Sequence, residues 1–121
     1  MIIEIPFKTP SVNHLYGQHG NHRYIKPEAK KLRAEIVDIC LLHSLELKDN
    51  ILPLEVHVKV YENWYTISKT VKKKDIANRE KFLIDSVFLG LGIDDKMIFK
   101  HVMEKIQSEE EKCTVEVTTY G

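Results

Sequence analysis

Residues 54–60 alternate strictly between two kinds of side chain, and this pattern constrains the fold more than any other part of the chain. Leucine or valine occupies each even position, and a charged residue or histidine occupies each odd position between them. Successive side chains of a β-strand point to opposite faces, so the segment predicts a strand with one buried face. Other elements have to cover that face.

Two segments with helical spacing can cover it. Pro27 suits the first position of a helix, and apolar or neutral residues then recur three and four positions apart, at Ala29, Leu32, Ile36, Ile39, Cys40 and His43. This pattern predicts an amphipathic helix of about four turns. A second helix is predicted from Asp75, which can act as its N-cap, to the region of Gly90 and Gly92. Its core stripe is Leu83, Ile84, Val87, Phe88 and Leu91.

The remaining segments predict three more strands and two connections. Strands are predicted at residues 1–7, 98–106 and 113–119, the last with Cys113, Val115 and Val117 on one face. Residues 11–23 have no periodicity and predict an irregular exposed loop, and residues 62–74 predict a polar, basic connection. The order is β-α-β-α-β-β, an α+β fold in which two helices pack on a small mixed sheet. We expect one domain over residues 1–121.

Composition restricts the classes of partner and compartment. Eighteen Lys and Arg balance eighteen Asp and Glu, so net charge gives no argument for a polyanionic partner, and any such argument depends on local charge. Local positive charge is concentrated at Lys69, Lys72, Lys73 and Lys74. No segment reaches the roughly 18 apolar residues of a membrane span, and residues 1–8 lack the pattern of a signal peptide. With two separated cysteines in apolar patterns, we expect a cytosolic protein with buried thiols and no membrane partner.

The candidate chemistry combines these lysines with three carboxylates. Asp75 lies at the start of the second predicted helix, and Asp94 and Asp95 lie just past its end. Carboxylates are ligands that Mg²⁺ prefers, and a nearby lysine would neutralise charge on a phosphodiester. A straight helix of about fourteen residues separates its ends by ~21 Å, so these groups can meet within one chain only if the loop after the helix folds back.

Each of these signals also has a structural explanation. Asp75 can be a helix cap, the lysine run can be a solvated loop, and Asp94 with Asp95 can belong to a turn. Lys81 and Asp85 have the spacing of a surface i,i+4 ion pair. The spacing of His14, His19 and His22 matches no zinc ligand set.

The order of the signals along the chain is more specific than any one of them. The run KKKDIANREKFLIDSVFLGLGIDD resembles the RusA family of Holliday junction resolvases, whose pattern is a basic stretch, D-x-D-N, a Lys three residues on, a helix and a final D-D. The positions in register are Asp75, Asn78, Lys81, Asp85, Asp94 and Asp95. The segments PSVNHLY (10–16) and RYIKPEAK (23–30) resemble the family's N-terminal loop and its entry into the first helix.

This resemblance implies a homodimeric, Mg²⁺-dependent endonuclease that nicks four-way DNA junctions symmetrically, in a prokaryotic cell or in the host of a phage or virus. It implies that Asp75 and Asp95, joined by Asp94, are metal ligands and that Lys81 is the catalytic cation facing the phosphate. It implies DNA contacts from the basic residues and the neighbouring amide: Lys69, Lys72, Lys73, Lys74 and Asn78. The family's dimer would also bring the acidic residues together.

The chain departs from the family pattern at Ala77, where the second carboxylate of D-x-D would stand. Either the ligand was lost naturally or an aspartate was replaced, which would trap an uncleaved state. Three hypotheses follow: a junction-resolving nuclease crippled at position 77, a non-catalytic protein that binds branched DNA, and a small structural or assembly protein. Metal titration separates the first from the other two, and salt-dependent DNA binding separates the second from the third.

Overall fold

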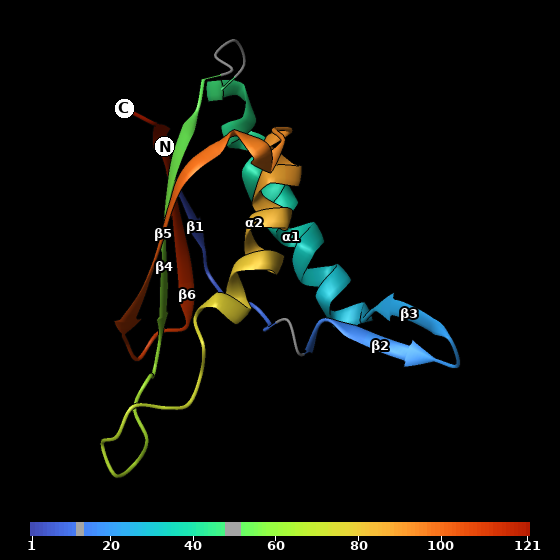
Figure 1. The fold of residues 1–121 in the computed structure, drawn as a ribbon, viewed down its shortest axis with the longest axis vertical. Coiled ribbons are helices and arrows are strands. Elements are labelled where there is room, and N and C mark those ends of the chain that lie inside the picture. The colour runs from blue at the N-terminus through green and yellow to red at the C-terminus, as the bar shows by residue number, and fades with distance from the viewer. Residues whose placement is uncertain (12–13, 48–51) are drawn as a thin grey trace.

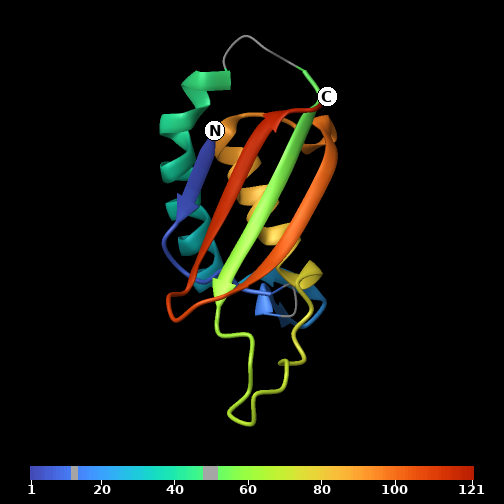
Figure 2. The same ribbon diagram turned by 90° about the vertical axis from the view of Figure 1, so that its left-hand side faces the viewer.

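The fold is a four-stranded sheet with two helices packed on one face (Figures 1 and 2). The computed structural model describes residues 1–11, 14–47 and 52–121. The sheet contains β1 (Ile2–Ile5), β6 (Lys112–Thr119), β4 (Leu54–Glu62) and β5 (Ile98–Gln107), in that order. β4 is parallel to β5 and antiparallel to β6, and β1 is antiparallel to β6. The predicted α+β class with a small mixed sheet is confirmed.

The alternating segment forms β4, an inner strand of the sheet with one buried face, and the buried face was predicted. Residues 54, 56, 58, 60 and 62 of β4 are buried, and the residues between them are half-buried. On β6, Cys113, Val115 and Val117 face the same core, as predicted. Parallel neighbours need a crossover, and α2 (Ala77–Leu91) supplies it between β4 and β5.

The helices cover the sheet through the predicted apolar stripes. α1 (Pro27–Ser44) has proline at its start, and it is longer than predicted, at 18 residues or about five turns. All five predicted core residues of α2 are buried, and Gly92 ends the helix in a left-handed conformation (φ 72°). Gly90 does not end the helix but allows α1 and α2 to pack closely, because it lies where the two helices meet. A Cβ atom there would stand 2.6 Å from Cβ of Cys40.

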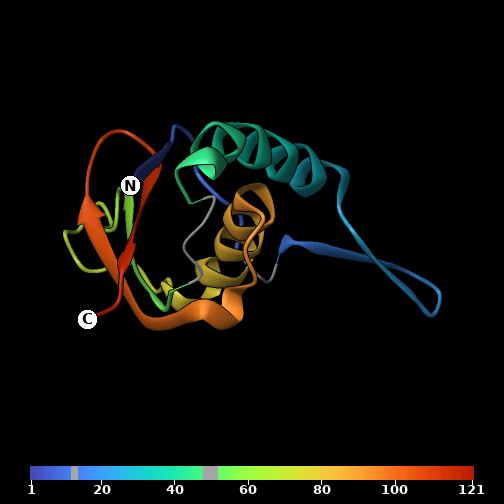
Figure 3. The same ribbon diagram turned by 90° about the horizontal axis from the view of Figure 1, so that it is seen from above.

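The prediction of an irregular loop at residues 11–23 was wrong in part. β2 (Tyr16–His19) and β3 (His22–Ile25) form a hairpin that extends away from the sheet and helices (Figure 3), whereas Val12 and Asn13 lie outside the described residues. Gly20, with φ 61°, occupies the first position of the two-residue turn, where positive φ is required. The hairpin residues are largely exposed, so the sequence lacks the apolar alternation that identifies a half-buried strand.

Two further predictions need correction at the start of α2. The predicted polar connection at 62–74 begins with two buried side chains, Glu62 and Trp64. The N-cap of α2 is Ile76 rather than Asp75, and no side chain caps it. Asp75 lies one residue earlier, where its Oδ1 still accepts a hydrogen bond from the Ala77 amide at 3.0 Å. This bond closes a local turn ahead of the helix, as Asp side chains commonly do.

Candidate active site

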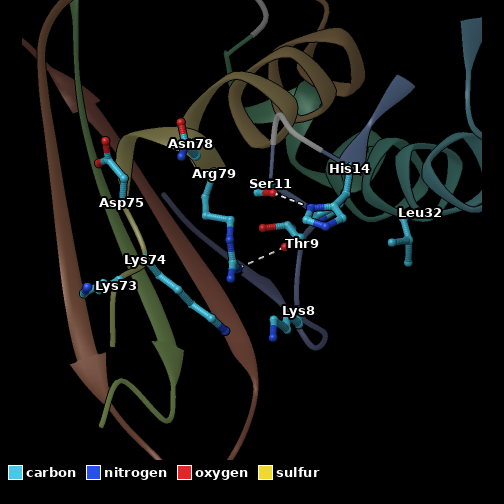
Figure 4. A pocket seen from close by; sticks show the side chains of 11 residues that line it. Lys8, Thr9, Ser11, His14, Leu32, Lys73, Lys74, Asp75, Asn78 and Arg79 are labelled. Carbon is cyan, nitrogen blue, oxygen red and sulfur yellow. Dashed lines mark hydrogen bonds between the residues drawn. The ribbon is translucent and has the colours of Figure 1, made fainter. Parts of the chain in front are cut away.

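A cleft opens at the N-terminal end of α2, between the segment after β1 and the segment that leads into the helix (Figure 4). Its volume is about 510 Å³. The side chains that line it are Lys8, Thr9, Pro10, Ser11, His14, Leu32, Lys73, Lys74, Asp75, Asn78 and Arg79. Four of these residues are basic and one is acidic, so the cleft is suited to an anion.

A buried carboxylate organises the cations of this cleft. Glu62, at the end of β4, accepts hydrogen bonds from Arg79 Nη1 to Oε1 (2.9 Å) and from Nη2 to Oε2 (3.2 Å). Lys74 Nζ lies 3.3 Å from Oε2, and Lys8 Nζ lies 3.8 Å from the same oxygen. Arg79 Nη1 also donates to the Thr9 carbonyl at 3.0 Å. The start of α2 is thereby tied to β4 and to the segment after β1.

These contacts shift the pKa values of Glu62 and Lys74. Burial raises the pKa of Glu62, but the hydrogen bonds and charge of Arg79, with Lys8 and Lys74, outweigh it and leave the pKa below its usual value. Burial and the neighbouring Lys8 lower the pKa of Lys74, against the opposing effect of Glu62. Glu62 therefore stays ionised in the fold, and its charge offsets part of the positive charge of the cleft.

The tryptophan fixes the backbone that carries the lysines. Trp64 donates from Nε1 to the Val60 carbonyl at 3.1 Å, and Lys105 Nζ lies 4.8 Å from the ring centroid. Lys105 also donates to the carbonyl of Lys74 at 2.7 Å, and the Lys72 amide donates to the carbonyl of Trp64. The basic segment is thus held against the sheet by hydrogen bonds, unlike the freely solvated loop that its composition also allowed.

The structure separates the predicted site residues into two groups. Asp75, Asn78, Lys73 and Lys74 line the cleft, and Ala77 is exposed beside Asp75 as the first residue of α2. Lys72 lies next to them along the chain, and Lys69 is exposed farther out on the same loop.

The other group lies at the opposite end of α2, as Figure 1 shows from the path of the chain. Asp94 accepts a hydrogen bond from the Lys96 amide at 2.9 Å and caps the short helix η3 (Asp95–Met97). Asp95 lines a second, shallower cavity of about 310 Å³ with Arg33, Asp85 and Ile93 among its neighbours. The loop after α2 therefore does not return to Asp75. Within residues 1–11, 14–47 and 52–121 of one chain, no three His, Cys, Asp or Glu side chains group as metal ligands.

Lys81 stands apart from both groups. Its Nζ lies 3.2 Å from Oδ2 of Asp85, in the i,i+4 arrangement that the spacing alone indicated. This hydrogen bond and the charge of Asp85 raise the pKa of Lys81, so the amine remains protonated. Both side chains are accessible, and such exposed pairs exchange readily with other partners.

Sequence reasoning missed Lys8, Glu62, Trp64 and Arg79. Two of them carried a signal. Glu62 continues the alternation of buried positions 54–60, and Arg79 lies three residues before Phe82, at the spacing of one helix face. A carboxylate and a guanidinium that both fall at buried positions are expected to pair. The histidines gave no common site: His14 Nδ1 bonds Ser11 Oγ at 2.9 Å, and His19 and His22 face each other across the hairpin.

The comparison with known families decides what kind of protein carries this cleft. The sequence profile of endodeoxyribonuclease RusA matches residues 6–118 of the 121-residue chain. The chain belongs to the RusA endodeoxyribonuclease family. Among curated proteins, none matches the chain in sequence.

Membership in the RusA family implies the function of a Holliday junction resolvase, a nuclease that acts on four-way DNA. The match includes the cleft, α2 and Asp95. None of the helices in the described part of the chain is long and apolar enough to cross a membrane.

Proposed function

We propose that this RusA family chain is a Mg²⁺-dependent endonuclease that resolves four-way junctions by paired symmetric nicks, and that Ala77 suppresses cleavage in the chain as given. The observation that carries the proposal is the cleft at the start of α2. Lys8, Lys73 and Lys74 line it together with Asp75, while a methyl group stands at position 77, two residues after Asp75. A phosphodiester fits these cations, and a carboxylate at 77 would lie two residues from Asp75.

The proposed metal site needs more carboxylates than one chain of this sequence provides at the cleft. Mg²⁺ commonly takes one or two carboxylates together with water and phosphate oxygens. Among the described residues, Asp75 is the only carboxylate that lines the cleft. The described residues of one chain therefore offer one of the two carboxylates of the proposed site, and no catalytic step through the metal follows from them. A second carboxylate has to come from position 77 or from another protomer.

A homodimer is the second part of the proposal. A four-way junction presents two equivalent strands, and a two-fold dimer presents two equivalent sites. Asp75 and Asp95 lie at opposite ends of the 15-residue helix α2, which is about 22 Å long at 1.5 Å per residue. An antiparallel arrangement of two protomers would place Asp95 of one near Asp75 of the other. This arrangement would add a carboxylate from the partner, and a carboxylate at position 77 would be a further ligand of the same site.

The residues of this chain have separate roles in the proposal. Lys72, Lys73 and Lys74 bind the DNA backbone, joined by Lys69 and Asn78. Lys81 faces the scissile phosphate after it exchanges Asp85 for a phosphate oxygen. Asp94 supports Asp95 from the neighbouring position. The cytoplasm is the expected compartment for such a nuclease.

The second candidate function is a branched-DNA binding protein without catalysis, and the observation that favours it is Ala77 itself. Loss of one negative charge beside bound DNA would leave affinity unchanged or slightly higher. In this alternative the basic cleft is retained for binding alone, and a carboxylate at 77 would not restore cleavage.

The deciding experiment compares the chain with its Ala77→Asp and Ala77→Asn variants on a labelled synthetic junction across a Mg²⁺ titration. Position 77 is exposed in the first turn of α2, where an acidic side chain is well tolerated. We expect Ala77→Asp to raise Mg²⁺-dependent nicking by roughly a hundredfold or more, and the isosteric amide to leave it unchanged. Equal cleavage by the original chain and Ala77→Asp would contradict the placement of the site. Tight junction binding without cleavage by any variant would favour the second candidate.

A further inference from the structure

The segment between β4 and α2 extends beyond the end of the sheet, past the point where α2 begins (Figures 1 and 2). Residues 63–76 form this segment, and we call its basic part, residues 63–74, the β4–α2 loop. Its outer part carries three exposed apolar side chains: Tyr65, Ile67 and Val71. Ile67 is fully exposed, more than any other large apolar residue in the described part of the chain. A single exposed apolar side chain is common, but three on one short loop mark a candidate interaction site.

Hydrogen bonds hold the tip of the loop in one shape. The Thr66 amide donates to the Thr70 carbonyl at 2.7 Å, and the Lys69 amide donates to the Thr66 carbonyl at 2.9 Å. The Thr66 hydroxyl bonds the hydroxyls of Ser68 (3.0 Å) and Thr70 (2.7 Å). Lys69 takes φ 65°, a left-handed conformation that is uncommon for a residue with a side chain. Ile67 is therefore presented at an ordered tip.

The base of the loop is equally well fixed. Tyr65 and Val71 form an antiparallel bridge, and the Lys72 amide donates to the carbonyl of buried Trp64 at 2.8 Å. The loop thus behaves as a short rigid extension of the sheet. A rigid tip loses little conformational entropy when it enters a partner.

The charge of the loop indicates the class of partner. Residues 63–74 contain four lysines and no acidic residue, and Asp75 follows them, in a chain whose net charge is zero. The loop ends with Lys73 and Lys74, which line the cleft together with Asp75. A polyanion bound in the cleft therefore passes beside the loop. An apolar tip flanked by lysines matches DNA, since the lysines can contact phosphates while the apolar side chain enters between bases.

We propose that Ile67 is a wedge that enters between base pairs at the branch point of a junction bound in the cleft. The inference rests on the proposed function, because it requires that the cleft hold branched DNA. At the branch point the continuous stack of each duplex is interrupted, so an inserted side chain displaces less stacking there than within an arm. The wedge would hold the branch open and fix its position relative to Asp75.

The test uses the chain as given with 2-aminopurine placed at the branch point of a synthetic junction, or ten base pairs away within an arm. Fluorescence of this base rises when it is unstacked. We expect binding to raise the branch-point signal severalfold and to leave the arm signal unchanged. Ile67→Ser should remove the rise while the dissociation constant changes less than about threefold, since the lysines supply most of the affinity. Ile67→Leu should retain the rise. Ile2→Ser, at an exposed apolar residue of the edge strand β1, is the matched control and should also retain it.

The possible outcomes separate the wedge from the proposed function. Junction binding without a fluorescence rise, or an equal rise with Ile67→Ser, overturns the wedge and leaves the nuclease proposal intact. Failure of the chain to bind any junction overturns both. If Ile67→Ser instead lowers the sedimentation mass from dimer to monomer, or releases the protein from vesicles of anionic lipid, the tip has a different partner and the wedge is wrong.

Discussion

Arg79 and Glu62 form a two-point ion pair between the first turn of α2 and the last residue of β4, with N–O distances of 2.9 and 3.2 Å. Both side chains are almost completely buried, at 6% and 2% exposure. Arg79 lines the cleft, and its pair with Glu62 fixes the segment that carries Lys74 and Asp75.

Glu62→Gln is expected to destabilise the fold by about 3–5 kcal/mol, because it leaves the Arg79 charge buried without a counter-charge. Urea denaturation followed by far-UV circular dichroism measures the change in the free energy of unfolding. The double variant Glu62→Leu/Arg79→Met removes both charges together and should recover much of the loss. If Glu62→Gln unfolds at the same urea concentration as the original chain, the pair has little energetic importance.

Acid should weaken the fold through the same carboxylate. The pKa of Glu62 lies below its reference value of 4.5 in the folded chain. Near this pH the carboxyl group therefore binds fewer protons in the folded chain than in the unfolded chain. Its contribution to stability is therefore present above about pH 4.5 and is lost as pH falls through the lower folded pKa. Urea midpoints measured from pH 6 to pH 3 should fall less steeply for Glu62→Leu/Arg79→Met than for the original chain. Parallel curves would exclude this carboxylate as a source of acid sensitivity.

The lysine run should govern the salt dependence of DNA binding. Replacing Lys72, Lys73 and Lys74 by Ala should weaken binding to any DNA and make the slope of log K against log salt shallower by roughly 0.9 per lost phosphate contact. Fluorescence anisotropy across a salt series measures the slope. The control replaces three lysines of the strands, Lys59, Lys100 and Lys112, which removes the same charge elsewhere. An equal change in both triple variants would mean that only net charge matters.

Lys81 should affect cleavage much more than binding if it exchanges Asp85 for a phosphate. In the Ala77→Asp background, Lys81→Ala is expected to lower the cleavage rate at least tenfold more than it lowers junction affinity. Asp85→Asn provides the control, because it frees Lys81 and should leave cleavage intact. Equal losses of binding and cleavage with Lys81→Ala would assign the lysine to anchoring alone.

Complementation between protomers tests whether a site combines Asp75 of one chain with Asp95 of another. In the Ala77→Asp background, Asp75→Asn and Asp95→Asn should each abolish cleavage. A heterodimer of the two variants would contain one site with both aspartates and one site with neither, so a mixture should regain single nicks without resolving the junction. A denaturing gel of the labelled strands distinguishes these products. A mixture that stays inactive, although sedimentation shows dimers that exchange subunits, would contradict the shared site.

The sequence determined the elements whose character depends on neighbours along the chain. The alternation of residues 54–60 predicted a strand with one buried face, and the apolar spacing at Leu83, Val87 and Leu91 predicted the buried face of α2. Such periodicities can be read from the sequence because the geometry of a helix or a strand fixes which of its residues face the core. The order of Asp75, Asn78, Lys81 and Asp95 likewise predicted the family that the profile confirmed.

The tertiary structure decided which distant residues meet. Local periodicity marks Glu62 and Arg79 as buried positions, but they are separated by 17 positions and meet only because α2 starts beside the end of β4. Asp75 and Asp95 belong to one sequence motif, yet α2 holds them at its opposite ends, since the loop after the helix enters β5 without turning back. The hairpin of β2 and β3 lacked a sequence signal because it buries little against the core, and alternation arises only where burial selects one face.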